Sequence, residues 1–362
     1  MSAVVAEVDR PAVAGVGGAR YDALVAALCA VFQGGAYLDA WAHVHRPELE
    51  TFFTPWHAVL YSGFFAVAAV TAAPLLWKRA PGTPWSAALP AGYDLSVIGV
   101  LVFFLGGVLD MLWHIAFGIE VDVEALISPS HLVLALGSTL ILTGPLRAAW
   151  RRSDATASWP AVFSLGFLLA SLAFWTQYAH HFGRPWGATG NRPTTQVFPV
   201  VAPDPLFRNV EIQSLYIAHA LGVVIILLQA ALMSGVVLLA LRRWGSRLPF
   251  GAFAVIFGIS AVSMGGARDQ LSLVPGAIVA GLLADALVRA AAPSLQRTVA
   301  LRGVAFAIPA IYFALYFLVI ALTRGVWWSM PLWSGTIVLA GAVGWLASWL
   351  VAPPAAPGSA RV

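Results

Sequence analysis

The chain alternates between long apolar stretches and short polar breaks. About 20 consecutive, mostly apolar residues are needed for a helix to cross the hydrocarbon core of a bilayer. Dividing the chain at its proline, glycine and charge clusters leaves ten candidate stretches, which cover residues 21–44, 56–77, 94–117, 130–150, 160–182, 212–241, 249–268, 271–291, 303–323 and 330–351. This pattern predicts an all-α integral membrane protein with about ten transmembrane helices, and therefore a lipid bilayer as its surroundings.

Composition supports this fold class. Hydrophobic residues make up 60% of the 362 residues and charged residues 10%, whereas soluble domains have about 45–50% and about 25%. The net charge of +4 is too small to indicate nucleic-acid binding. The single cysteine, Cys29, excludes a disulfide framework and a thiolate metal cluster.

Most basic residues lie on one side of the predicted membrane, and the histidines lie on the other. Fourteen of the 20 lysine and arginine residues lie on the side that carries both termini. The positive-inside rule therefore predicts a multi-pass protein of the cell membrane with both termini in the cytoplasm. All eight histidines and ten of the sixteen acidic residues fall on the other, outer side. Ionisable groups at membrane depth are costly, so such a cluster needs a compensating partner, for which a metal ion is one candidate.

One order of residues occurs twice near this outer side. Each copy has an Asp, a His four residues later, then a Glu, a Ser/Thr-Pro step and a second His seven residues after the Glu. The first copy consists of Asp39, His43, Glu50 and His57, and the second of Asp110, His114, Glu124 and His131. The second histidines are 74 residues apart, which indicates an internal repeat of a helical hairpin.

Two weaker copies follow. The third keeps the four-residue step from Gln177 to His181, with Gln in place of Asp, and the pair Glu211 and His219. The fourth keeps Asp269 but has no histidine. We therefore expect a membrane domain of four diverged hairpins over residues 21–291, after a cytoplasmic segment 1–20. An additional hairpin over 292–351 and a disordered tail over 352–362 complete the predicted organisation.

The spacing predicts a metal centre. Residues four apart lie on one face of a helix, and a Ser/Thr-Pro step begins a helix with a capping hydroxyl and a proline in the first turn. Each hairpin thus brings its acids and histidines toward one point. Imidazole with carboxylate suits iron, copper(II), zinc or manganese. The candidate ligands are Asp39, His43, Glu50, His57, Asp110, His114, Glu124 and His131, with His181, Glu211 and His219 in or near the site.

The motif also has a family resemblance. DAWAH (39–43) with His57, and DMLWH (110–114) with His131, resemble the metal motif of the C-type subunit of copper membrane monooxygenases. That family has a single motif with a slightly shorter gap to its last histidine, and the likeness is confined to residues 39–57 and 110–131. The resemblance implies a non-haem, oxidative metal site near a membrane face.

These features predict an integral-membrane metalloenzyme with a mono- or dinuclear non-haem centre at the extracytoplasmic face. We expect it to oxidise, or alternatively hydrolyse, a lipophilic small molecule. Three other hypotheses stay open at this stage. The first is a metal-ion or small-solute transporter, although the inner halves of the first spans carry few polar residues. The second is a haem protein that uses His57/His131 or His181/His219. The third is a structural subunit with a vestigial site.

Overall fold

The computed structural model describes residues 17–46, 53–77, 82, 84–118, 120, 123–152, 156–193 and 210–354, and at 77, 86 and 210–213 the backbone alone. This part of the chain is helical. The helices are α1 (Ala19–His45), α2 (Pro55–Trp77), α3 (Asp94–Phe117), α4 (Glu124–Ile127), α5 (Pro129–Leu142), α6 (Gly144–Arg151), α7 (Trp159–Trp175), α8 (Val210–Arg243), α9 (Ala252–Ala267), α10 (Val274–Ala291), α11 (Thr298–Thr323) and α12 (Met330–Val351).

Several of these helices suit a membrane. Seven of the helices in the described ranges are long and apolar enough to cross a bilayer, namely α1, α2, α3, α8, α10, α11 and α12. The pair α5 and α6, bent by 42°, would make an eighth span, and the bend coincides with Pro145 in the first turn of α6,. The apolar helices α7 and α9 are shorter, with 17 and 16 residues. The all-helical, multi-pass character is confirmed, while the span count of ten stays a prediction.

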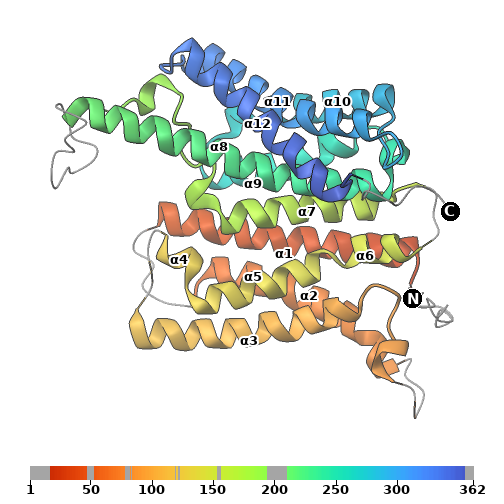
Figure 1. Cartoon of the computed structure of the whole chain (residues 1–362). Coiled ribbons are helices and arrows are strands. Elements are labelled where there is room, and N and C mark those ends of the chain that lie inside the picture. The colour runs from red at the N-terminus through yellow and green to blue at the C-terminus, as the bar shows by residue number, and fades with distance from the viewer. Residues whose placement is uncertain are drawn as a thin grey trace.

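The long helices run side by side, so that the ends of α1 and α3 and the starts of α2, α5 and α8 gather at one end of the bundle (Figure 1). The histidines lie on these ends and in the loop after α7. The start of α1 and the end of α12 lie at the opposite end (Figure 1). Which end faces the cytoplasm stays a prediction.

In each of the first two hairpins, a glycine on the first helix lies against the backbone of the second helix. A Cβ on Gly35 of α1 would lie 2.7 Å from the Cα of Leu60 in α2. A Cβ on Gly106 of α3 would lie 3.1 Å from the backbone nitrogen of Leu134 in α5. These glycines each come four residues before an Asp, and the two leucines each come three residues after a second His. Equivalent positions therefore make equivalent contacts, which sets the same helix separation near both sets of candidate ligands.

The returning helices carry a second pair of close glycines. A Cβ on Gly63 would lie 2.7 Å from the Cα of Phe32, and one on Gly137 would lie 2.7 Å from the Cα of Phe103. Both glycines come six residues after a second His. The two hairpins thus match at both crossing points. Whether all four predicted repeats share this geometry stays a prediction.

The interior below the histidine end is filled by apolar side chains. Within the first two hairpins, Cys29, Phe64 and Ile141 are fully or almost fully buried in one cluster. On the other side of α1, helices α7 to α12 enclose a second and larger apolar core. The Tyr37 hydroxyl of α1 donates a hydrogen bond to the carbonyl oxygen of Ala170 in α7 at 2.6 Å. Helix α1 therefore contacts both cores, as do α6 and α7, which contribute side chains to each.

Candidate metal centre

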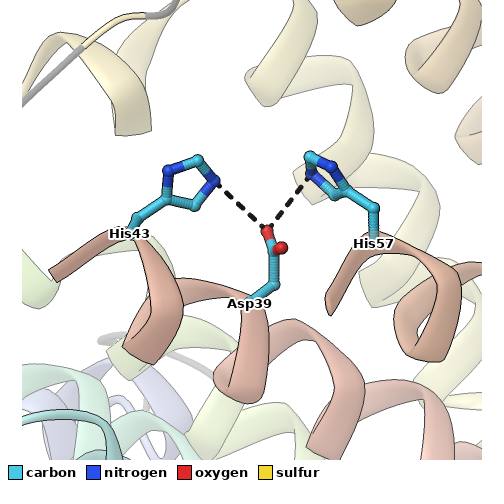
Figure 2. Close-up of side chains that lie close together, drawn as sticks. All are labelled: Asp39, His43 and His57. Atoms are coloured by element: carbon cyan, nitrogen blue, oxygen red, sulfur yellow. Dashed lines mark ion pairs between the residues drawn. The ribbon is translucent and has the colours of Figure 1, made fainter. Parts of the chain in front are cut away.

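The first candidate site is a triad on α1 and α2. Asp39 and His43 lie one turn apart near the end of α1, and His57 lies in the first turn of α2. The start of α2 is fixed by Pro55 and by Thr54, whose Oγ1 accepts a hydrogen bond from the His57 N–H at 3.1 Å. Figure 2 shows the Asp39 carboxylate between the two imidazoles. Asp39 Oδ2 lies 3.6 Å from His43 Nε2 and 3.3 Å from His57 Nε2.

The second triad, on α3 and α5, has nearly the same geometry. His114 Nε2 lies 3.5 Å from Asp110 Oδ2, and His131 Nε2 lies 3.4 Å from Asp110 Oδ1. The two imidazole centroids are 6.0 Å apart with an interplanar angle of 63°, against 6.0 Å and 64° in the first triad. The predicted helix start is confirmed at Pro129. The matching helix ends and starts thus place the same three side chains in the same arrangement.

Both arrangements fit a metal ion. In each triad, one ligand atom from every residue lies within 4.8 Å of the other two. Ions with bonds of about 2.1 Å to N and O have neighbouring ligand atoms roughly 3.0–3.4 Å apart, and the nitrogen–oxygen distances of 3.3–3.6 Å are close to this. In addition, Asp39 Oδ1 is buried without a hydrogen-bond partner among the described residues. A bound ion would satisfy such an oxygen.

The two triads open into one cavity of about 340 Å³. Tyr61 of α2 also lines it and interacts electrostatically with both Asp39 and Asp110. Away from the triads the wall contains the apolar and aromatic side chains Phe32, Leu60, Phe103, Leu134, Phe174 and Trp175, together with polar and charged ones that include Gln33, Arg46, Gln177 and Arg268. The cavity therefore combines two sets of metal-type ligands with a wall that has both apolar and polar parts, as is common for small-molecule sites.

Of the two glutamates predicted in the first two hairpins, the structure places Glu124. Glu50 lies outside the described residues. Glu124 begins α4 and is exposed, and it is not part of the cavity wall. Glu120 lines the cavity instead. Its Oε1 accepts a hydrogen bond from Trp113 Nε1 at 2.7 Å, and its Oε2 lies 3.7 Å from His131 Nδ1.

The glycine that ends α3 could have indicated the position of Glu120. Gly118 ends the helix with a positive φ of 85° and an extended ψ of 177°, a conformation that glycine adopts at little cost. Glu120, two residues later, then faces the helix end and its histidine. The sequence-based list of candidate ligands did not include it.

His181 lies apart from the cavity. The helix α7 ends at Trp175, and His180 and His181 are buried in the loop that follows. His181 Nε2 lies 3.3 Å from the Tyr312 hydroxyl, and its carbonyl oxygen accepts a hydrogen bond from Tyr316 at 3.0 Å. Burial lowers the pKa of His180 to about 3 and that of His181 well below its ordinary value. Both imidazoles are therefore neutral packing groups of the second core.

His219 has a different environment again. It lies near the start of α8, where its ring stacks on Trp327 with centroids 4.6 Å apart and contacts Trp328 edge-on. The side chain of Glu211 is outside the described part of the structure. Of the described side chains of the third copy, only Gln177 reaches the cavity, where its Oε1 accepts a hydrogen bond from Arg268 at 2.8 Å.

The fourth copy contributes a link between the two cores. His45, the last residue of α1, stacks on Trp41, and its Nε2 lies 2.7 Å from Asp269 Oδ2. Asp269 adopts a positive φ of 55°, is largely exposed and is not among the residues that line the cavity. The fourth Asp is therefore engaged in a contact between α1 and the turn after α9.

Comparisons with known protein families, with curated proteins and with solved structures found no match for this chain.

Proposed function

We propose that the chain is an integral-membrane metalloenzyme that holds non-haem transition-metal ions at the two triads and acts on a lipophilic small molecule in the shared cavity. The observation that carries this proposal is the duplication of one geometry. Two Asp-His-His sets, from two matching hairpins, open into the same cavity. Two histidines with one carboxylate leave coordination positions free on an ion, which is typical of catalytic sites.

The residues have separable tasks in this proposal. Asp39, His43 and His57 would hold one ion, and Asp110, His114 and His131 the other. Iron or copper would supply redox chemistry and zinc Lewis acidity. We favour oxidation, which is what the resemblance of the two motifs to a copper monooxygenase motif implies. The aromatic wall, including Phe103 and Trp175, would bind the apolar body of the substrate and exclude water from it.

A haem group is disfavoured by the positions of the histidines. His181 contacts Tyr312 and Tyr316, whereas His219 stacks on Trp327. These two histidines therefore have separate environments and present no common face to a porphyrin. His57 and His131 each have an Asp oxygen 3.3–3.4 Å from Nε2, where a haem iron would have to bind.

Transport is the second hypothesis, and the filled interior argues against it. Below the cavity, side chains such as Phe64, Ile141 and Leu142 are almost completely buried and apolar. A permeating ion needs polar groups or water along its path. In the described part of the first two hairpins, the cavity therefore ends at an apolar barrier, as expected for a binding pocket.

Elemental analysis tests the proposal. Protein purified without a metal-affinity tag is compared with the double variant His43→Ala/His114→Ala. We expect one or two equivalents of iron, copper, manganese or zinc in the native protein and a loss of most of this metal in the variant. The variant Ser62→Ala serves as a control, because Ser62 is exposed on α2 and donates its hydrogen bond to the Val59 carbonyl of its own helix.

Two results would contradict the proposal. Native protein without metal, and unable to take it up from added iron, copper, manganese or zinc, would leave the triads as hydrogen-bonded polar groups. A Soret absorption band that is lost in the double variant would assign the histidines to haem.

A further inference from the structure

We infer that the two triads are not equivalent: the triad of Asp110, His114 and His131 binds its ion more tightly, and the triad of Asp39, His43 and His57 holds the ion to which an external ligand coordinates. This inference rests on the proposed function and assigns a separate role to each site. Its basis is a set of differences at matching positions of the two hairpins.

The first difference concerns the residue before the second histidine. In the second hairpin this residue is Ser130, whose hydroxyl donates a hydrogen bond to Asp110 Oδ1 at 3.0 Å. In the first hairpin it is Trp56, whose ring packs against Trp41. Asp39 Oδ1 accordingly has no hydrogen-bond partner among the described residues. The Ser130 hydroxyl thus orients Asp110 before an ion arrives, whereas no hydroxyl among the described residues does the same for Asp39.

The second difference concerns the hydroxyl three residues before that histidine. Thr54 Oγ1 accepts the backbone N–H of His57 and so caps α2. Ser128 Oγ instead lies 2.7 Å from His131 Nδ1, with Glu120 Oε2 on the same nitrogen at 3.7 Å. When Nδ1–H donates to this hydroxyl, Nε2 keeps its lone pair for an ion. Partners of this kind fix the tautomer and the orientation of a ligand and typically change metal affinity about 10–100-fold.

The third difference is access. The side chain of His43 is 41% exposed and that of Asp39 13%, whereas His114 is 13% exposed and Asp110 4%. The first triad therefore lies at the open side of the cavity, where water or a small ligand reaches an ion directly. The second histidines differ little, since His57 is 15% exposed and His131 19%, so the difference in access concerns the Asp and the first His of each triad. Orientation and burial thus favour tight binding at the second site and ligand exchange at the first.

Cobalt(II) and azide test the inference on the full chain in detergent or nanodiscs. Metal-stripped protein is titrated with cobalt(II) and followed by calorimetry and visible absorption, for the native chain and for His43→Ala, His114→Ala, Ser130→Ala and Ser62→Ala. We expect two classes of site that differ at least tenfold in affinity. His114→Ala should remove the tighter class and His43→Ala the weaker one.

The Ser130→Ala variant tests the orientation of Asp110 without removing a metal ligand. Ser130→Ala should weaken the tighter class about tenfold and leave the weaker class unchanged, while Ser62→Ala should change neither. Azide added to the cobalt-loaded protein should alter the spectrum of native protein and of His114→Ala but not that of His43→Ala.

The contrary results are distinct from a failure of the proposed function. Equal affinities, a Ser130→Ala variant identical to native protein, or an azide response that persists in His43→Ala would overturn the inference while metal binding stands. Native protein that binds no cobalt(II) would overturn the proposed function itself, and the inference with it.

Discussion

Phe32 of α1 and Phe103 of α3 meet edge to face, with ring centroids 4.9 Å apart. Each comes seven residues before the aspartate of its triad, Asp39 or Asp110. The two hairpins therefore touch through equivalent side chains, and both rings belong to the cavity wall. Because a helix rises 1.5 Å per residue, the contact lies about 10 Å below the carboxylates and closes the cavity on the side away from the histidine end.

Truncation of this contact should cost stability. Phe103→Ala removes a ring that is 4% exposed. Removing a buried Phe ring and leaving a cavity in its place typically costs about 3–5 kcal/mol. We expect a fall of this order in the free energy of unfolding, measured by denaturant titration in detergent. Phe104→Ala is the matched control, because the neighbouring ring is 53% exposed. Equal losses in the two variants would show that Phe103 does not pack between the hairpins.

The adjacent glycines Gly34 and Gly35 should respond in opposite ways to alanine. A Cβ at Gly35 would lie 2.7 Å from the Leu60 Cα, whereas a Cβ at Gly34 would meet nothing within 4 Å. Gly35→Ala should therefore push α1 and α2 apart, lower the thermal midpoint and reduce metal affinity at the first triad. Gly34→Ala should raise stability by up to about 1 kcal/mol, because alanine favours a helix. A Gly35→Ala variant with native stability and metal content would refute this packing.

Much of the fold and the centre of the site were predictable from the sequence, because they depend on local rules. The ten apolar stretches all overlap helices of the structure. The four-residue spacing of Asp39 and His43 placed both on one helix face, and the Thr54-Pro55 step placed His57 in the first turn of α2. Each of these positions follows from helix geometry and capping within a few residues.

The remaining contacts depend on packing between distant segments. The same step from Gln177 to His181 predicted a third set of ligands, but α7 ends at Trp175, and His181 turns toward Tyr312. Glu120 enters the cavity because Gly118 reverses the chain. Spacing along the sequence specifies neither the residue at which a helix stops nor the partner that a loop side chain finds across the bundle.

Acid should destabilise the protein through His180. Its pKa is about 3 in the folded chain because of burial, against about 6.5 when unfolded. Between these values the unfolded state binds the additional proton, so stability is full above pH 6.5 and decreases as the pH falls toward 3. The expected loss between pH 7 and pH 5 is about 2 kcal/mol from this residue. Denaturant titrations at both pH values should show a smaller loss for His180→Gln.

All other ionisable groups are common to native protein and the variant, so the difference between the two proteins isolates His180. An identical pH dependence would mean that the His180 imidazole takes up a proton in the folded protein. His45→Gln provides a comparison on the same end of the bundle, because His45 is partly exposed and already paired with Asp269.

Filling the cavity should separate substrate binding from metal binding. Ala36 and Ala30 both lie on α1, but Ala36 lines the cavity whereas Ala30 is exposed on another face. Ala36→Phe places a ring in the apolar space without replacing any residue of a triad. We expect it to retain metal content and to lose binding of trifluoromethylbenzene, a probe small enough for a cavity of 340 Å³, in fluorine NMR saturation-transfer measurements. Ala30→Phe adds the same ring toward the surroundings, so it should keep both properties and report the background from detergent. If Ala36→Phe binds the probe as well as Ala30→Phe does, the apolar wall is not a binding surface, and the metal ions would act on a ligand held at the open side of the cavity.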